Sequence, residues 1–201
     1  MTIRNYILIV LCFVFAAVPP LAAQGARAEL YGGYVYAKVN PDTPLKKEDM
    51  NGWVASVTGY ANSWFGVGGE ISGAYGDLSS AKSYGPAPHG KEYSYLFGPQ
   101  FRFLDNARIS TSIRILLGGT FGQVKLNSST TSSQQQALLN AGYQGFNQTK
   151  FAALFALPVD VGVTKLVALR VEPGLYVTDF NQTGLGNFRI SVGPVFRFGG
   201  K

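Results

Sequence analysis

Along most of the chain, hydrophobic and polar residues alternate with a period of two, which indicates β-strands. The segment Phe188–Phe198 shows the pattern clearly: its even-numbered positions are aromatic, aliphatic or proline, whereas Arg189, Ser191 and Arg197 stand at odd-numbered positions. Because successive side chains of a strand point to opposite faces, such a segment has one apolar face and one polar face. Residues 98–103 nearly repeat residues 193–198, so this type of strand occurs twice.

Eight segments of this kind are separated by residues typical of turns. They are predicted at about 29–39, 52–62, 65–77, 91–104, 108–124, 149–161, 165–178 and 186–198. Their connections alternate in length: residues 62–64, 105–107 and 162–164 are predicted to be tight turns, whereas the other connections are mostly longer and polar. Short periplasmic turns and longer extracellular loops are typical of bacterial outer-membrane barrels.

The composition favours a sheet that faces lipid over an ordinary soluble domain. Charged residues make up only 14% of the chain and aromatic residues 13%, against about 25% charged residues in a typical soluble domain. After residue 28, no segment reaches the roughly 18 uninterrupted apolar residues of a spanning helix, and only helices and closed barrels satisfy their backbone in lipid. The predicted fold is therefore all-β, an eight-stranded antiparallel transmembrane β-barrel with short periplasmic turns and longer extracellular loops.

The first 28 residues have the features of a cleavable secretory signal peptide. Arg4 precedes the apolar run 7–18, and small residues follow it, with Ala26-Arg27-Ala28 fitting a cleavage site. The run is shorter than the roughly 20 residues of a spanning helix. Cleavage is expected after Ala28, with Ala23 as the alternative.

Two parts of the chain are therefore expected: a signal peptide at 1–28 and a single outer-membrane barrel domain at 29–201. The only cysteine, Cys12, lies in the signal peptide, so the mature domain is expected to have no disulfide and no cysteine metal site. After residue 28 the chain has 15 basic and 11 acidic residues, and this net charge of +4 is spread over strands and loops without forming a cluster. Nucleic acid is therefore not an expected partner.

The C-terminal segment carries the motif Ser191-x-Gly193-x-x-Phe196-x-Phe198. With its alternating strands, the chain resembles the small outer-membrane β-barrels of Gram-negative bacteria, namely the OmpA transmembrane domain and OmpX-like proteins of the porin superfamily. The resemblance covers everything after the signal peptide and implies an integral protein of the bacterial outer membrane, in contact with its lipids and lipopolysaccharide. It also implies that Ser191, Gly193, Phe196 and Phe198 form the signal that the outer-membrane assembly machinery recognises.

Eight charged residues fall on the polar faces of the predicted strands. They are Glu70, Arg102, Arg114, Asp160, Arg170, Glu172, Arg189 and Arg197. An eight-stranded barrel is just wide enough for side chains to fill its interior, and a buried unpaired charge costs several kcal/mol. We therefore expect a lumen plugged by a charge network, with Glu70 and Glu172 as partners of the arginines. Five arginines against three acids leave excess positive charge for backbone carbonyls, Tyr176 or solvent.

Neither a catalytic residue nor a cofactor or metal site is predicted, and the protein is expected not to be an enzyme. The only histidine, His89, lies in the Pro-Gly segment 85–90, with no nearby strand-borne serine and carboxylate to orient it. A catalytic relay needs a base held by a third group. The chain resembles lipid A deacylase barrels in size, but their His-Ser-Glu set has no matching motif here. One histidine without a mature cysteine is a poor metal-binding set.

Some parts of the pattern are irregular. In the first strand, Tyr31, Tyr34 and Tyr36 fall on both phases, so its inward face is ambiguous. Prolines inside strands remove a ladder hydrogen bond and are expected at β-bulges, which bend a strand. These prolines are Pro99, Pro158, Pro173 and Pro194.

The longest predicted loop, 125–148, contains the polar run 128–136, which is expected to be mobile. The short apolar part 137–141 is expected to form a helical turn or to rest on the barrel rim. Binding often resides in surface loops on a rigid scaffold, so contacts with an unidentified extracellular partner are expected here, although an inert hydrophilic cap explains the loop equally well.

The favoured function is a non-enzymatic outer-membrane barrel with a structural or surface-interaction role. Three alternatives stay open: a narrow pore, a membrane-embedded lipid hydrolase, and a soluble lipocalin-like periplasmic barrel. In the last of these, apolar side chains would line a ligand cavity instead of facing lipid. They would be Phe101, Phe103, Phe196 and Phe198.

Overall fold

The computed structural model describes residues 28–39, 48–77, 87–106, 108–125, 131–140, 146–179 and 186–199. The predicted signal peptide lies outside the described residues except for Ala28, which begins the first strand. The described elements follow in the order β1 (Ala28–Val39), β2 (Glu48–Tyr60), β3 (Phe65–Asp77), β4 (His89–Asp105), β5 (Ile109–Lys125), α2 (Ser132–Asn140), β6 (Phe146–Ala156), β7 (Val159–Gly162), β8 (Val167–Thr178) and β9 (Asn187–Phe198).

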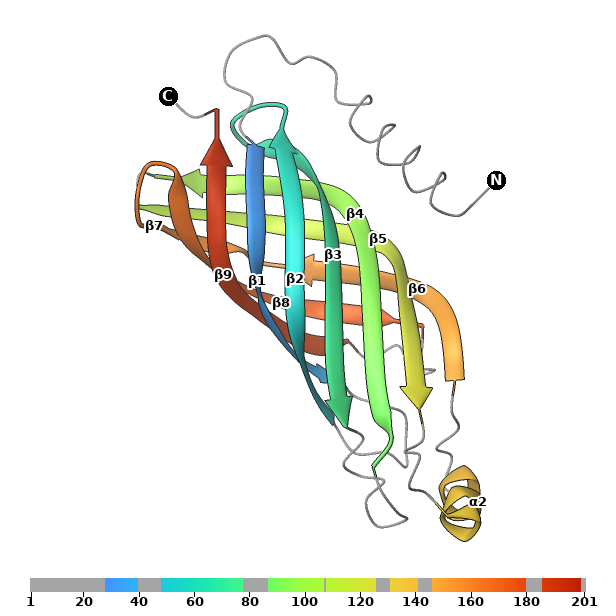
Figure 1. Ribbon diagram of the computed structural model, residues 1–201. Helices are drawn as coiled ribbons and strands as arrows, with labels where there is room; N and C mark the ends of the chain where they lie inside the picture. The colour runs from blue at the N-terminus through green and yellow to red at the C-terminus, as the bar shows by residue number, and fades with distance from the viewer. Residues whose placement is uncertain are drawn as a thin grey trace, which may run out of the picture.

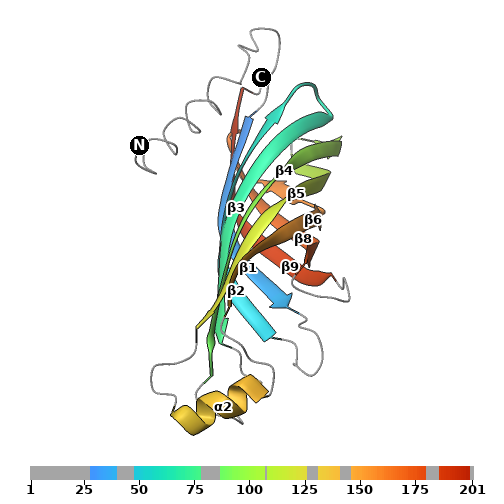
Figure 2. The same cartoon turned by 90° about the vertical axis from the view of Figure 1, so that its right-hand side faces the viewer.

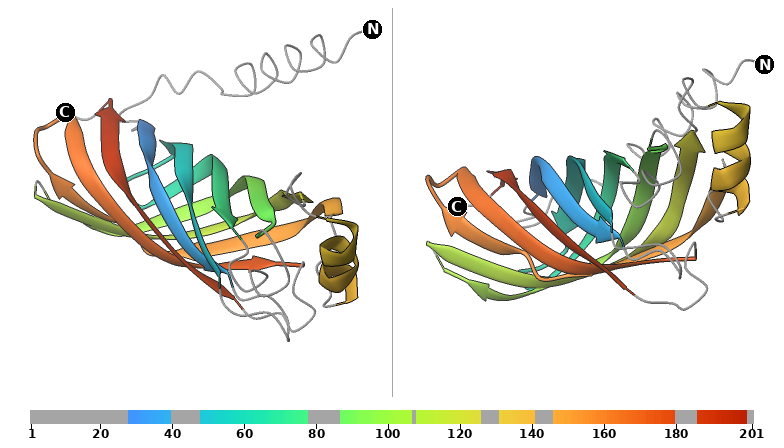
Figure 3. Two further views of the ribbon diagram at one scale, coloured as in Figure 1. Left: turned by 60° about the horizontal axis from the view of Figure 1, so that its bottom comes forward. Right: turned by 90° about the horizontal axis from the view of Figure 1, so that it is seen from below.

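The strands curve around a common interior and form a closed antiparallel barrel (Figures 1 and 3). Their order around the wall is β4-β3-β2-β1-β9-β8-β6-β5, and pairing between β4 and β5 closes it. β6 and β7 occupy a single position, because both pair with β5 on one side and with β8 on the other. They correspond to the single strand predicted at 149–161, interrupted at Leu157 and Pro158. The eight strand positions confirm the sequence prediction.

The barrel has a turn end and a loop end (Figure 2). At the turn end lie the start of β1, the end of β9, the tight turns 61–64 and 163–166, and residues 106 and 108 between β4 and β5. The Asn62 side-chain oxygen accepts hydrogen bonds from the backbone N–H groups of Trp64 and Phe65, at 3.0 and 2.7 Å, which fixes the first turn. Helix α2 lies at the opposite, loop end.

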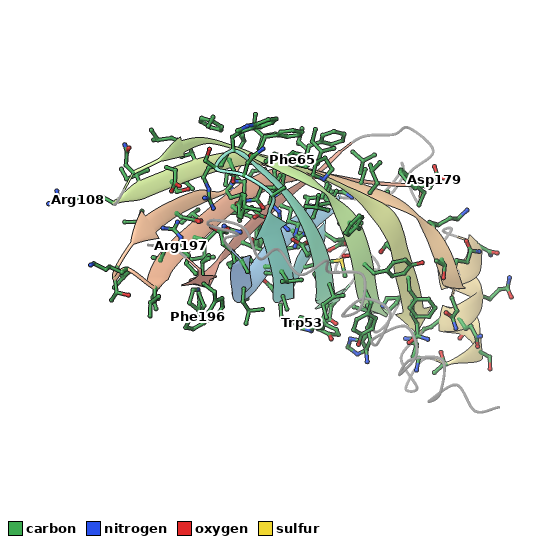
Figure 4. All side chains as sticks on the ribbon, turned by 90° about the horizontal axis from the view of Figure 1, so that it is seen from above. Trp53, Phe65, Arg108, Asp179, Phe196 and Arg197 are labelled. Carbon is green, nitrogen blue, oxygen red and sulfur yellow. The ribbon has the colours of Figure 1, made fainter. Side chains whose placement is uncertain are left out.

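Buried and exposed positions alternate along the strands, and apolar side chains occupy the exposed ones. Ten of those that are 40% to 65% exposed are together called the apolar belt: Leu30, Val57, Ile71, Phe97, Leu117, Phe155, Leu169, Leu175, Val192 and Phe196. A soluble monomer rarely exposes an apolar surface this extensive. Viewed from the turn end, Phe196 lies outside the wall while Arg197 points into the interior (Figure 4).

The structure resolves the ambiguous first strand. Glu29, Tyr31 and Val35 are buried in the interior, whereas Tyr34 is 56% exposed on the outside. β1 therefore keeps a regular alternation. The sequence obscured it because tyrosines stand on both of its faces.

The expectation that the mid-strand prolines lie at bulges was wrong. The register between β4 and β5 shifts between Arg102 and Leu104, away from the four prolines. Pro99 and Pro194 instead lie where pairing with one neighbouring strand is interrupted and then resumes in the same register. Each proline, which has no backbone N–H to donate, therefore lies where the hydrogen-bond ladder is already interrupted. No bulge with an extra residue is needed to accommodate it. The same holds for Pro158 and Pro173, which lie in the gap between the two stretches of wall built by β6 and β7.

The polar run in the loop after β5 was expected to be mobile, but residues 132–136 belong to helix α2. Thr131 and Gln134 form a capping box: the Thr131 N–H donates to the Gln134 side chain at 3.0 Å, and the Gln134 N–H donates to Thr131 Oγ1 at 3.5 Å. This local signal outweighed the low-complexity composition. The remainder of the run, 128–130, lies outside the described residues. No helix in the described ranges is long and apolar enough to cross a membrane.

Candidate functional site

The candidate site is the barrel lumen, where the structure places all eight charged residues selected from the sequence. Seven of them are at most 6% exposed. The eighth, Arg197, has a side chain that is 21% exposed near the turn end. These residues come from six different strands, and alternation points each of them inward.

A first group, called the turn-end cluster, consists of Glu29, Arg102, Asp160, Arg170 and Arg197. The two oxygens of Glu29 lie 2.6 Å from Arg102 Nη2 and 2.8 Å from Arg170 Nη2. Asp160 lies 2.7 Å from Arg170 Nε and 3.0 Å from Arg197 Nη2. Glu29 also lies 3.7 Å from Arg197 Nε, so both acids contact Arg170 and Arg197, and the cluster forms one continuous network.

Glu29 was missed from the sequence, although it is 2% exposed and central to this network. The inward and outward positions of the first strand could not be told apart, so the charge of Glu29 could not be assigned to the interior. An indirect signal was closure of the barrel, which pairs the first strand with the last. It places Glu29 beside Arg197 on β9, a strand whose inward positions are clear from the sequence. Asp105 was also missed, and it lies 3.2 Å from Arg102 Nη1. With Glu29 and Asp105 included, five acids stand against five arginines, and the predicted positive excess disappears.

A second group, called the central cluster, consists of Glu70, Arg114, Glu172 and Arg189. Arg114 Nη1 lies 2.8 Å from Glu172 Oε2 and 3.2 Å from Glu70 Oε2. Arg189 Nη1 lies 2.7 Å from the other oxygen of Glu70. Glu70 and Glu172 are therefore partners of the arginines, as the sequence predicted, and both share Arg114.

Neutral hydrogen bonds link further strands inside the barrel. Gln100 Nε2 donates to the Tyr60 hydroxyl at 2.5 Å and to Ser112 Oγ at 3.0 Å. Thr58 Oγ1 donates to Gln100 Oε1 at 3.2 Å. The guanidinium of Arg102 lies over the Tyr60 ring, 3.9 Å from its centroid. Sequence reasoning followed charges only and so missed these uncharged members, which alternation also points inward.

The lumen also contains apolar clusters, which corrects the expectation of a purely polar inner face. One cluster is built around Leu96, Leu116 and Leu154, and another around Val54 and Val195. An interior filled by side chains needs volume as well as charge. Aliphatic residues that face inward supply that volume and leave the ion pairs in a low-dielectric surrounding, where they interact strongly.

The four residues of the proposed assembly signal fall on both faces of β9. Ser191 is buried and accepts a hydrogen bond from the Tyr31 hydroxyl at 2.9 Å. Gly193 faces inward where the neighbouring backbone comes close: a Cβ there would lie 2.1 Å from the Gly32 carbonyl oxygen. Phe196 and Phe198 face outward, 43% and 53% exposed. Packing explains the two small residues, and recognition by the assembly machinery stays a prediction.

His89 lies at the loop end, and its surroundings differ from the expectation in one respect. It begins β4, and its Nδ1 contacts the carboxylate of Asp77 on β3, so a strand-borne carboxylate does orient it. Both side chains are 55% exposed. Within the described ranges, no serine is hydrogen-bonded to His89 and no three His, Cys, Asp or Glu side chains are grouped as metal ligands.

Aromatic side chains gather at both ends of the outer surface. At the turn end, Trp64 stacks on Phe101 with ring centroids 6.2 Å apart, and Phe65 lies 5.5 Å from the same ring. At the loop end, Trp53, Tyr75 and Tyr93 are partly exposed. The apolar belt lies between these groups. Aromatic girdles on both sides of an apolar band mark the two membrane interfaces of a transmembrane barrel.

No protein-family model matches the sequence, and no curated protein matches it. Solved structures do match. The crystal structure of Ail, the attachment invasion locus protein of Yersinia pestis, in complex with the heparin analogue sucrose octasulfate, has a TM-score of 0.59 at 18% identity, covering 87% of this chain and 100% of that one. Neisserial surface protein A has a TM-score of 0.59 at 13% identity, covering 87% and 98%. The outer membrane protein OprG of Pseudomonas aeruginosa has a TM-score of 0.52 at 13% identity, covering 87% and 96%.

The fold is that of the small outer-membrane β-barrels. This confirms the eight-stranded barrel predicted from the sequence. The apolar belt and its two aromatic margins form the lipid-facing surface of an integral membrane protein. The fold and this surface together place the chain in the bacterial outer membrane.

Proposed function

We propose that this protein is a non-enzymatic outer-membrane barrel with a structural or surface-interaction role, whose lumen is closed by side chains. Ion pairs that cross the lumen carry the proposal. Glu29 on β1 contacts Arg102 on β4, and Glu70 on β3 contacts Arg189 on β9. In each pair the strands are three positions apart around the wall, so the contact spans the interior.

The surroundings of these pairs support a plug over an open channel. The side chains of Glu70 and Arg114 are fully buried, and that of Glu172 is 2% exposed. The turn-end cluster is also linked to the neutral network of Gln100 by way of Tyr60 and Arg102. An eight-stranded barrel is just wide enough for such side chains to fill its interior.

A surface-interaction role belongs at the loop end. Helix α2 lies there, beyond the ends of the strands (Figure 2). Ail, whose barrel has the same fold, is an attachment invasion locus protein and was crystallised with a heparin analogue. This supports a contact role for such a barrel, and surface loops on a rigid scaffold are where contacts usually form.

Electrical measurements on the folded protein test the plug. Protein whose folding is verified by heat-modifiable migration on gels is inserted into planar lipid bilayers, beside bilayers without protein and bilayers that contain a porin. We expect no steady conductance above that of the protein-free bilayer. Steady single-channel steps from the wild-type barrel would favour the narrow pore instead.

Mass spectrometry of lipid A tests the non-enzymatic assignment. Lipid A is compared before and after expression of the wild-type chain and of the His89→Ala variant. We expect the same masses in all samples, because His89 and Asp77 form an exposed pair without a hydrogen-bonded serine in the described part of the chain. A mass change that the wild type causes and His89→Ala abolishes would favour the lipid hydrolase.

A further inference from the structure

One sector of the outer surface differs from the rest of the wall. Near the loop end, six outward side chains of β1 to β4 are amphipathic aromatics, and together they are called the tyrosine face: Tyr34, Tyr36, Trp53, Tyr75, Tyr93 and Tyr95. The described outward positions of β6, β8 and β9 carry no tyrosine or tryptophan. The other sector carries phenylalanines instead, such as Phe151 and Phe188, so the tyrosine face differs from it in the polar atoms of its rings.

Five of the six side chains of the tyrosine face are hydrogen-bonded to one another or to neighbouring side chains. The Tyr36 hydroxyl donates to Asp49 at 2.7 Å, and the Tyr34 hydroxyl donates to Asn51. Trp53 Nε1 donates to the Tyr75 hydroxyl at 3.4 Å, which in turn donates to the Tyr93 hydroxyl at 3.1 Å. These bonds hold the rings in fixed positions, while 37% to 56% of Tyr34, Trp53, Tyr75 and Tyr93 stays exposed.

A glycine makes this arrangement possible. Gly73 pairs with both Trp53 and Tyr93, and a Cβ at this position would lie 2.8 Å from Trp53 Nε1. The indole therefore lies over a position without a side chain. The result is a preformed aromatic surface whose rings need no rearrangement on binding, which lowers the entropic cost of holding a ligand.

The chemistry of this sector changes in steps toward the loop end. Aliphatic members of the apolar belt, such as Val57 and Ile71, come first, and the tyrosine face follows. Two residues nearer the loop end than Tyr93, Lys91 pairs with Tyr75. Two residues further again, His89 pairs with Lys125 on β5. Neither lysine has an ion pair among the described residues.

The acids near this rim already have partners. Asp77 contacts His89, and Asp49 lies 4.0 Å from the Lys38 ammonium. Three lysines, Lys38, Lys91 and Lys125, stand against these two acids, so the net charge above the aromatic rings is positive. A ligand that matches all three steps has acyl chains, a carbohydrate body that packs against aromatic rings, and phosphate groups at the height of the lysines.

We propose that the tyrosine face binds the phosphorylated sugar headgroup of a lipopolysaccharide molecule in the outer leaflet. Acyl chains follow the apolar belt, sugars pack against the rings of Trp53 and Tyr93, and phosphates contact Lys91 and Lys125. The assignment rests on the proposed outer-membrane barrel with its loop end outward. It adds a preferred lipid and a preferred side of the barrel.

The two tryptophans of the chain provide a matched pair of probes, because Trp53 lies in the tyrosine face and Trp64 lies in a turn at the opposite end. Trp64→Phe leaves Trp53 as the sole tryptophan, and Trp53→Phe leaves Trp64. Each variant is refolded into phosphatidylcholine vesicles that contain, in both leaflets, lipopolysaccharide or phosphatidylglycerol with a nitroxide quencher on the headgroup. Fluorescence is measured against the mole fraction of labelled lipid.

We expect labelled lipopolysaccharide to half-quench Trp53 at a several-fold lower mole fraction than labelled phosphatidylglycerol does, and to show no such preference at Trp64. In the Trp64→Phe background, Lys91→Gln combined with Lys125→Gln should raise the half-quenching fraction of lipopolysaccharide several-fold. The turn-end control Lys165→Gln should leave it unchanged. Equal quenching of Trp53 by the two lipids, or no effect of the double lysine variant, would overturn the assignment.

Gel migration of every sample separates this result from failure of the proposed function. A chain that does not become heat-modifiable has not folded as a barrel, and the proposed function then fails as well. A folded barrel without a preference for lipopolysaccharide at Trp53 contradicts the tyrosine-face assignment alone.

Discussion

Among single residues, Glu172 shows what an inward charge contributes. Both of its carboxylate oxygens accept hydrogen bonds from Arg114 Nη1, at 3.1 and 2.8 Å, and Arg114 is fully buried. Without the charge of Glu172, Arg114 would keep only Glu70 as an ionic partner, at 3.2 Å. Removing one member of a buried pair costs roughly 3–5 kcal/mol, because the other charge stays desolvated.

We therefore expect Glu172→Gln to lower the free energy of unfolding by about 3 kcal/mol. The adjacent outward residue Val171 is 36% exposed, and Val171→Ala should cost less because lipid fills the vacated space. Urea unfolding of both variants in lipid vesicles measures the difference. Equal urea midpoints for the two variants would show that the charge of Glu172 contributes no more to stability than an outward valine side chain does.

At the scale of elements, β9 combines packing with the proposed assembly signal. Phe196 and Phe198 are outward and exposed, so their loss leaves the lumen untouched. We expect the double variant Phe196→Ala with Phe198→Ala to fail to insert and to be degraded in the periplasm. Immunoblots of outer-membrane fractions measure the folded amount. Normal amounts of folded double variant would show that these two rings only pack.

The repeated Gly-Pro pairs of β4 and β9 solve the same local problem. Gly193 lies where the backbone of β1 approaches, and an added Cβ would lie 2.1 Å from Gly32 O and 2.5 Å from Gly33 Cα. At Gly98 the corresponding contact is 2.1 Å, to Ile115 O. In both pairs a proline follows at the gap in the hydrogen-bond ladder.

Gly193→Ala should therefore destabilise the barrel by more than about 1 kcal/mol, since backbone atoms have to shift. Gly59→Ala is the matched control, because a Cβ at that outward strand position meets nothing within 4 Å. Urea midpoints in vesicles compare the two variants. A Gly193→Ala barrel as stable as Gly59→Ala would contradict the close approach of β1 and β9.

The strands were predictable because their two environments differ so strongly. A wall with lipid outside and a filled lumen inside imposes a period of two on nearly every segment. The prediction failed where another local rule acted. Tyrosines face both sides of β1 and concealed Glu29, a capping box formed α2 inside a polar run, and gaps in the ladder accommodated the prolines. The inward charges were visible in the sequence, but their pairing across the lumen depends on closure of the barrel.

For the whole molecule, closure connects the two surfaces described above. The apolar belt requires a barrel without free sheet edges, because unpaired backbone groups are not tolerated in lipid. The same closure brings β1 opposite β4, and β3 opposite β9, so that charges far apart in the sequence meet in the lumen. The cross-lumen ion pairs therefore depend on the barrel as a unit.

A double-mutant cycle on Glu29 and Arg102 tests this most directly, since their 2.6 Å contact spans the lumen between β1 and β4. Glu29→Gln, Arg102→Gln and the double variant are unfolded with urea in lipid vesicles beside the wild type. We predict a coupling free energy above the roughly 1 kcal/mol that exposed ion pairs reach. Effects that add to within about 0.5 kcal/mol would contradict a lumen closed by ion pairs.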